Sequence, residues 1–191
     1  MTLSVTKEAF VVSNVGDSRC IIYRQSLPQQ SSFPGKHMSD WVTECLSRDH
    51  KPNMVGESDR IVSMNGRVDY YKDYDGKRIG PARVYAKDDD GPGLAMSRSL
   101  GDTVAERLGV ISTPDVRVAR RQCERDRAIV LCSDGVHEFL SNERIGEIVA
   151  PYHSSNDTEG ACRKLVEEAT NQWLKEDSVI DDITAVVIFF Q

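Results

Sequence analysis

Hydrophobic positions along the chain follow two spacings, one typical of a helix and one typical of buried strands. The segment 158–175 has an apolar residue at every fourth position: Ala161, Leu165, Ala169 and Trp173. This spacing predicts an amphipathic helix whose apolar face packs on a sheet. The segments 127–132 and 183–190 are almost continuous apolar runs, which are typical of buried strands. We expect 183–190 to be a central or near-central strand of its sheet.

Shorter signals divide the N-terminal part of the chain into strands and a loop. Strands are predicted at 8–15 and 20–24, on either side of a hairpin-like turn at Gly16-Asp17. Alternation of apolar and polar residues predicts a half-buried strand at 41–46. The stretch 25–40 is rich in Ser, Gln, Pro and Gly, and this composition predicts a surface loop.

Two shorter helices are predicted from their end signals. A helix over 57–65 is expected to end at Gly66, which would supply the left-handed conformation of the stop. Ser141 is placed to cap a helix over 142–150, which Pro151 ends. Strand pairs therefore come first and two helices precede the last strand. This order is typical of an α+β fold and not of regular β-α-β alternation.

The composition predicts one soluble domain covering residues 1–191. A chain of 191 residues with 39% hydrophobic content can bury a core. The net charge of −6 and the pI near 5.3 argue against nucleic acid or an anionic membrane as a partner, because both require a basic surface. No apolar stretch reaches membrane-spanning length, and the N-terminus lacks the pattern of a secretory signal.

The cysteines indicate the compartment in which we expect the protein. They are odd in number, include no CxxC pair and lie mostly in apolar strand or helix contexts: Cys20, Cys45, Cys123, Cys132 and Cys162. We interpret them as reduced, buried thiols of a cytoplasmic or nuclear protein.

Two short carboxylate motifs carry the candidate chemistry. Ser133-Asp134-Gly135 follows the apolar run 127–132, and Asp181-Asp182 precedes the run that ends the chain. An aspartate at the end of a buried strand lies at the rim of its sheet, where charge meets solvent and ligand. Two such rims brought together would form a site for Mg²⁺ or Mn²⁺, which prefer carboxylate oxygens. For either motif alone, a simple turn or helix cap remains the alternative.

Three further motifs precede these two in the chain: Asn14-Val15-Gly16-Asp17-Ser18-Arg19, Arg48-Asp49-His50-Lys51-Pro52 and Ser97-Arg98-Ser99-Leu100-Gly101-Asp102. In this order and spacing, the five motifs resemble the metal-dependent serine/threonine protein phosphatases of the type 2C class (PPM family). The resemblance runs from about Phe10 to the C-terminus. It implies a sandwich of two antiparallel β-sheets flanked by helices. It also implies Mg²⁺- or Mn²⁺-dependent hydrolysis of phosphoserine and phosphothreonine in proteins.

One part of the family pattern is absent from these residues. Family members carry an Asp-Gly-His-Gly motif, whose aspartate bridges two catalytic metals, and an upstream arginine that grips the phosphate. The resemblance therefore implies the C-terminal part of a phosphatase domain that lacks its N-terminal strands, and it leaves the phosphate-binding residue unknown. We expect this segment alone to have little activity. Its unpaired sheet edges would invite self-association of the truncated chain.

The resemblance also assigns roles to individual residues. Asp134 and Asp181 match metal-ligating aspartates, and Asp182 fills the position beside the second ligand. The nucleophile implied is water activated by the metals, with no catalytic side chain beyond the ligands. Asp49 matches a ligand of a weaker third metal in some members. The alternative for Asp49 is a turn aspartate paired with Arg48 or Lys51.

The residues after Ser-Asp-Gly depart from the family pattern. The family commonly has Trp-Asp where this chain has His137-Glu138. Glu138 keeps the carboxylate but is longer by one methylene, so its role as a third-metal ligand is open. His137 could bind metal, but a polar residue at the start of a helix is the favoured interpretation. We interpret Arg98 and Asp102 as structural residues that form salt bridges.

Other acidic and histidine residues do not indicate a metal site. Asp73-Tyr74-Asp75-Gly76 resembles a calcium loop, but Tyr71 and Ala82 occupy its first and last ligand positions. The run 88–90 is interpreted as a solvated turn. The four histidines lack the mutual spacing of a zinc site.

Three functions are consistent with these motifs. The favoured one is an active phosphatase acting on phosphorylated proteins. The second is a pseudophosphatase module that binds a phosphoprotein or a regulatory partner without catalysis. The third, more distant, is a divalent-metal-binding protein of unrelated function.

Overall fold

The computed structural model describes residues 1–27, 40–177 and 179–191, which cluster by their contacts into two compact units. Unit 1 comprises Met1, Ser13–Asp17 and Arg48–Val116. Unit 2 comprises Thr2–Val12, Ser18–Ser47 and Arg117–Gln191. The prediction of a single domain stays a prediction. The predicted loop at 25–40 lies almost entirely outside the described residues.

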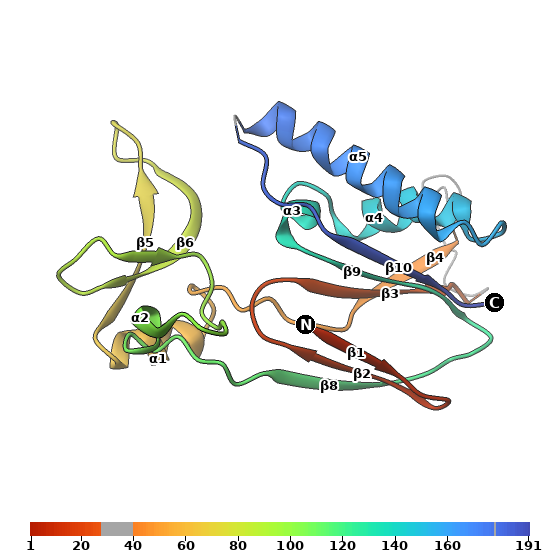
Figure 1. Ribbon diagram of the computed structural model, residues 1–191, viewed down its shortest axis with the longest axis horizontal. Helices are drawn as coiled ribbons and strands as arrows, with labels where there is room; N and C mark the ends of the chain where they lie inside the picture. Colours follow the sequence, from red (N-terminus) through yellow and green to blue (C-terminus); the bar gives the residue numbers. More distant parts are fainter. Residues whose placement is uncertain (28–39, 178) are drawn as a thin grey trace. The chain divides into compact units, whose positions relative to one another are not determined.

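Unit 2 contains two antiparallel layers. One sheet has the order β10-β9-β3-β4, formed by Ala185–Phe189, Asp126–Cys132, Arg19–Gln25 and Trp41–Cys45. The other has the order β1-β2-β8, formed by Thr2–Val5, Ala9–Asn14 and Asp115–Arg120, with the ends of β2 and β8 counted in unit 1. Helices α4 (Asn142–Val149) and α5 (Thr158–Glu176) cover the four-stranded sheet on the side away from β1, β2 and β8 (Figure 1).

The alternating residues of β3 show how these layers are held together. Ile21 and Tyr23 pack into a core with α4 and α5. Cys20 and Ile22 pack into a second core that also contains Phe10 and Val12 of the β1-β2-β8 sheet. Because both faces of β3 are covered, its residues are buried without alternation, as expected for a strand between two layers. The α+β prediction is confirmed.

Two predictions about strand placement are wrong. Gly16-Asp17 does not form a hairpin turn, because β2 and β3 belong to different sheets. The last strand, β10, pairs with β9 and lies at the edge of the described sheet, not at its centre. It is apolar on both faces because Val187 packs toward the helices and Ile188 toward the second sheet. Coverage by two layers explains the apolar run without a central position.

The helices of unit 2 agree closely with their predicted ends. Helix α5 starts after Asp157, whose Oδ1 accepts from the Gly160 backbone N–H at 2.8 Å. Ser141 caps α4, since its Oγ accepts from the Arg144 backbone N–H at 3.1 Å. Pro151 lies in a 3₁₀ turn, η1 (Ala150–Tyr152), directly after α4. A four-residue helix, α3 (Asp134–His137), precedes α4. No helix in the described parts of the chain combines the length and apolar character required to cross a membrane.

Unit 1 is built around a small sheet and two short helices. Its sheet has the order β5-β6-β7, formed by Gly66–Lys72, Arg78–Ala86 and Pro92–Leu94. Helices α1 (Glu57–Ser63) and α2 (Thr103–Glu106) complete a core of Ile61, Val84, Ala105 and Val110.

The C-terminal end of α1 corrects the predicted stop. The left-handed residue is Asn65, with φ 60°, and not Gly66, which begins β5. Gly66 is required for a different reason. A Cβ atom at this position would lie 2.6 Å from Ile61 Cγ2 and 2.9 Å from the Leu108 carbonyl oxygen. Tertiary packing, rather than helix termination, therefore selects glycine here.

The cysteine prediction is partly corrected. All five cysteines are free, and Cys20 and Cys132 are buried, but Cys123 is exposed. Burial raises the pKa of the Cys20 thiol to about 12, and the nearby Cys45 and Cys132 add to this shift. Cys20 therefore stays protonated near neutral pH and is a poor nucleophile.

The packing of Gly66 generates a stability prediction. Gly66→Ala should lower the free energy of unfolding by about 1–3 kcal/mol, because the new methyl group overpacks the site against Ile61. Asn65→Gly should change it by less than about 0.5 kcal/mol, because glycine adopts positive φ without strain. Urea unfolding followed by circular dichroism measures both variants. Equal stability of the two would show that Gly66 is not packed as described.

Candidate metal centre

The two carboxylate motifs lie at the same end of the four-stranded sheet. Strands β9 and β10 are antiparallel, and Cys132 pairs with Ala185 in their register. The end of β9 therefore meets the start of β10. Asp134 follows the first strand by two residues, and Asp181 precedes the second by four.

Ser133 ties the two motifs together through three hydrogen bonds. Its backbone N–H donates to the Thr184 carbonyl oxygen at 3.0 Å. Its Oγ donates to the Asp182 carbonyl oxygen at 3.0 Å and accepts from the Thr184 backbone N–H at 3.0 Å. Each bond joins one motif to the other, so the backbone and the side chain of Ser133 together hold the two loops in place.

Gly135 lets the two motifs approach closely. A Cβ atom at position 135 would lie 2.4 Å from the Asp182 carbonyl oxygen, a distance that side chains do not tolerate. The Ser-Asp-Gly motif therefore needs glycine for contact with the second motif. This contact brings Asp134 and Asp181 to one small region of the surface.

A backbone N–H orients each aspartate. Asp134 Oδ1 accepts from the Gly135 N–H at 3.0 Å, and Asp181 Oδ1 accepts from the Asp182 N–H at 2.7 Å. Asp134 is half-buried and Asp181 is exposed. Both carboxylates are therefore at the solvent boundary, as a site for a hydrated cation requires.

Glu138 lies one helical turn after Asp134. The Glu138 backbone N–H donates to the Asp134 carbonyl oxygen at 2.8 Å, so the two residues have the i, i+4 relation that places side chains on one helix face. Glu138 is exposed. His137 is the last residue of α3 and is buried, so the interpretation of a polar residue at a helix start is wrong.

The donor atoms at this edge fit a hard divalent cation. Asp134 and Asp181 offer carboxylate oxygens, which suit Mg²⁺ and Mn²⁺, and Mg²⁺ commonly takes only one or two protein carboxylates. Within residues 1–27, 40–177 and 179–191, no group of three or more His, Cys, Asp or Glu side chains lies close enough to hold a metal ion. The candidate centre in the described residues therefore rests on the pair Asp134 and Asp181, and Glu138 does not complete a group of three with them.

The other three motifs meet in unit 1. The Asn14 side-chain amide donates to the Arg48 carbonyl oxygen at 3.0 Å, which links the first motif to the second. The Ser97 backbone N–H donates to the His50 carbonyl oxygen at 2.8 Å, which links the second to the third. Asp49 lies between these contacts and is half-buried. Its assignment to a third metal stays a prediction.

Lys51, the alternative partner of Asp49, forms an ion pair with Asp17. Its Nζ lies 2.6 Å from Asp17 Oδ2. This ion pair joins the first and second motifs again.

Arg98 forms the predicted salt bridges. Its Nη2 lies 2.6 Å from Glu57 Oε1, and its Nη1 lies 2.8 Å from Asp115 Oδ1. Glu57 is only 3% exposed and also accepts hydrogen bonds at 2.7 Å from Arg60 Nη2 and Ser97 Oγ. Burial by itself would raise the pKa of Glu57. The hydrogen bonds from Arg98, Arg60 and Ser97 outweigh burial and hold that pKa well below its ordinary value.

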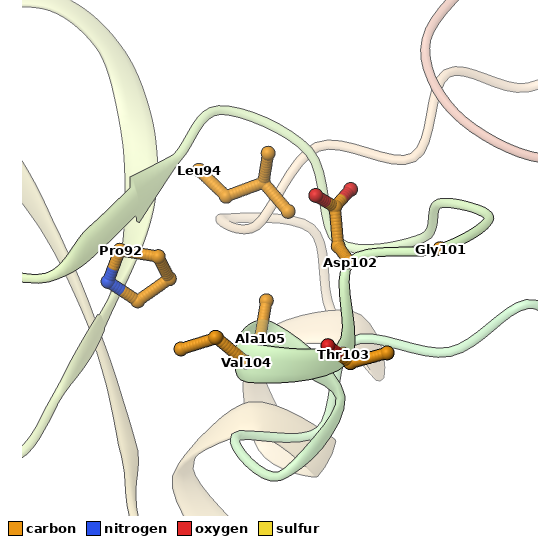
Figure 2. A pocket seen from close by; sticks show the side chains of 7 residues that line it. All are labelled: Pro92, Leu94, Gly101, Asp102, Thr103, Val104 and Ala105. Atoms are coloured by element: carbon orange, nitrogen blue, oxygen red, sulfur yellow. The ribbon is translucent and has the colours of Figure 1, made fainter.

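Asp102 does not behave as predicted. Among the described residues it forms no ion pair, and its side chain does not cap α2. It lines a cavity of about 280 Å³ whose walls are polar and apolar in about equal measure, with Pro92, Leu94, Thr103 and Ala105 among the lining residues (Figure 2). The interpretation of Asp102 as a salt-bridging residue is therefore wrong.

The acidic turns that were set aside as metal sites are ordinary turns. Asp73 Oδ1 accepts from the backbone N–H groups of Asp75 and Lys77, and this closes the turn between β5 and β6. Asp90 pairs with Arg67 at 2.7 Å and is almost fully exposed.

Comparison with known proteins gives the family. The protein phosphatase 2C family model matches residues 1–178, which is most of the chain. The chain belongs to the protein phosphatase 2C family. The rice protein named "Probable protein phosphatase 2C 48" (Oryza sativa subsp. japonica) is 38% identical over 98% of this chain and 50% of its own length. The Arabidopsis thaliana protein named "Probable protein phosphatase 2C 34" is 34% identical over 100% of this chain and 49% of its own. The chain thus spans about half the length of these relatives.

Solved phosphatase structures have the same fold. The serine-threonine phosphatase 2C of Toxoplasma gondii matches with a TM-score of 0.79 and 25% identity, over 99% of this chain and 57% of that protein. A phosphatase from a pathogenic strain of Toxoplasma gondii matches with a TM-score of 0.65 and 26% identity, over 96% and 49%. The predicted family and fold are confirmed.

Sequence reasoning found the two aspartates but missed the residues that hold them. Ser133 was quoted only as part of a motif, and no sequence signal distinguishes a bridging serine from a capping one. Thr184 contributes only its backbone, which no residue pattern can indicate. Gly135 had the clearest available signal, because glycine after a catalytic-type aspartate is typical of a close backbone approach.

The Glu57 cluster generates a prediction about pH. A carboxylate whose folded pKa lies below its ordinary value of 4.5 stabilises the fold above about that pH. The stabilisation is lost as pH falls below 4.5 toward the folded pKa. Glu57→Gln should therefore lower the free energy of unfolding by about 3 kcal/mol at pH 7, because it leaves Arg98 with a poorer partner.

The acid limb of the stability curve provides the control for this prediction. Glu57→Gln should lose less stability than the parent between pH 5 and pH 3. In the parent, the unfolded chain takes up a proton at Glu57 over this range, and glutamine cannot. Glu106→Gln, an exposed carboxylate in the same unit, should follow the parent curve. Urea unfolding at several pH values measures all three proteins. Parallel curves for Glu57→Gln and the parent would contradict the prediction.

Proposed function

We propose that the protein containing these residues is a Mg²⁺- or Mn²⁺-dependent phosphatase of phosphoserine and phosphothreonine in proteins. The observation that carries the proposal is the junction of the two carboxylate motifs, joined by the Ser133 hydrogen bonds and the close approach of Gly135. Family membership and the phosphatase names of the relatives support it.

The chain's own residues have distinct tasks in this proposal. Asp134 and Asp181 would hold the cation, and Ser133 keeps the loops that carry them in register. A divalent cation bound there supplies a water of lowered pKa and neutralises charge on phosphoryl oxygens. Gly135 keeps the two loops close enough for both carboxylates to serve one metal centre.

The partners and compartment follow from the same proposal. Phosphorylated proteins would be the substrates, in the cytoplasm or the nucleus. The five free cysteines support a reducing compartment, where thiols are not oxidised to disulfides.

The ligand assignment predicts the effect of removing each charge. Asp134→Asn and Asp181→Asn in the full-length protein should each lower kcat/KM at least about 10²-fold, because each keeps the side-chain volume but weakens metal binding. Hydrolysis of a phosphothreonine peptide with millimolar Mn²⁺ measures the loss. The matched controls Asp73→Asn and Asp75→Asn, in the turn between β5 and β6, should stay within a few-fold of the parent.

The outcomes separate the proposed function from its alternative. Full activity of Asp134→Asn with unchanged metal dependence would show that the ligand assignment is wrong. A parent protein that binds phosphoprotein without hydrolysis would support the pseudophosphatase alternative instead.

A third-metal role predicts a different dependence on metal concentration. Glu138→Gln and Asp49→Asn should lower activity by less than the ligand variants, and rising Mn²⁺ should recover part of the loss. The reason is that a weak site fills only at high concentration. Activity measured from micromolar to millimolar Mn²⁺ tests this. A loss that is the same at every Mn²⁺ concentration would rule out the third-metal role.

A further inference from the structure

Trp173 contacts the turn that carries Asp134. The indole Nε1–H donates to the Gly135 carbonyl oxygen at 2.6 Å. The indole ring also packs edge-to-face on Phe139, with ring centroids 4.7 Å apart and planes at 79°. Carbonyls in the last turn of a helix have no intrahelical partner, and α3 is only four residues long. Trp173 therefore satisfies and fixes a carbonyl directly beside Asp134.

Rigid packing determines where Trp173 lies. Helix α5 is held on the sheet by Ala161, Leu165 and Ala169, each at most 1% exposed. Trp173 is the next residue of that stripe, and it reaches beyond the core to α3. The position of the Gly135 carbonyl is thus set by its contact with helix α5.

The same end of α5 leads to the second carboxylate. Helix α5 ends at Glu176, and Asp181 follows five residues later in the chain. Asp182 is in turn bonded to Ser133. One end of α5 is therefore connected to Asp134 through the Trp173 hydrogen bond and to Asp181 through the chain.

We propose that Trp173 is a positioning residue that sets the metal affinity of the Asp134–Asp181 centre, an inference that rests on the proposed function. A carboxylate on a loose turn must be ordered when the cation binds, and this ordering weakens binding. A turn that is already fixed avoids that cost. Partners of this kind, which contact the ligand's supports and not the metal, typically change metal affinity 10- to 100-fold.

The test uses the full-length protein and measures metal binding without substrate. Trp173→Phe keeps a ring against Phe139 but removes the N–H donor. Isothermal titration calorimetry should show a Mn²⁺ Kd raised about tenfold. At saturating Mn²⁺ the kcat of Trp173→Phe should return to within a few-fold of the parent, because the ligands themselves are intact.

Trp41→Phe is the matched control. Trp41 is the other tryptophan of the printed sequence, and it packs at the same core against Tyr23 and His153 at 6.0 and 5.4 Å between ring centroids. It should lower thermal stability to a similar degree without changing the Mn²⁺ Kd. Equal rises in Kd for both variants would indicate a general loss of packing and overturn the inference.

Asp134→Asn distinguishes the failure of this inference from the failure of the proposed function. An unchanged Kd for Trp173→Phe, with a large loss for Asp134→Asn, would overturn the role of Trp173 alone. Unchanged binding by Asp134→Asn as well would remove the metal centre and the proposed function together. Should Trp173→Phe not fold, Phe139→Leu serves as a second variant. It removes the ring that packs on the Trp173 indole, and Phe139 itself is 38% exposed. Its Kd should rise a few-fold, and an unchanged Kd would also overturn the inference.

Discussion

Burial of β9 on both faces is the constraint on which the site depends. Ala128 and Val130 pack toward the helices, while Ile129 packs toward the second sheet. A strand held from both sides cannot shift without opening two cores, and a shift of one residue would exchange its two faces. The end of β9 is therefore a fixed point. Ser133, Asp134 and Gly135 take their positions from it.

The hydrogen bonds of Ser133 extend this fixed point to a segment about fifty residues later in the chain. The β10 strand is less buried than β9 and lies at the edge of the described sheet. The residues just before β10 are nonetheless held beside Asp134, because Thr184 bonds to the Ser133 side chain and Asp182 packs against Gly135. The positions of the carboxylates thus depend on one short side chain bonded to backbone groups, which is more rigid than contacts between long side chains.

Local signals predicted the helices correctly. Two predictions of strand placement were wrong because strand pairing depends on residues far apart in the sequence. The four-residue spacing of α5 depends only on the helix itself, so its ends were found within a residue or two. The Gly16-Asp17 turn was recognised as a turn, but which strands pair depends on residues more than a hundred positions away in β9. The apolar run of β10 could not distinguish an edge strand between two layers from a central one. Asn65 and Gly66 can both adopt positive φ, and only the contact of Gly66 with Ile61 decided between them.

The candidate site was predicted to a similar extent. The motifs predict Asp134 and Asp181 as metal ligands because the two motifs occur together at strand ends, and this assignment stays a prediction. The side chains that support them carry no such signal. Trp173 fits the apolar stripe of α5, and nothing in that stripe indicates that its N–H reaches a carbonyl in α3. The sequence predicts a salt bridge for Asp102 as it does for Arg98, yet Asp102 lines a cavity beside Leu94 and Thr103.

The register of β10 means that the number of residues between Asp181 and the strand sets the position of Asp181. Thr184 must face Ser133, and Ala185 must face Cys132, for the three hydrogen bonds to form. Residues added between α5 and Asp181 would lengthen the chain before the two aspartates and leave this arrangement in place. A single residue added between Asp182 and Ala185 would instead displace both aspartates relative to Asp134 while the sheet stayed intact. Insertions before Asp181 should therefore be tolerated, whereas a single residue inserted after Asp182 should not.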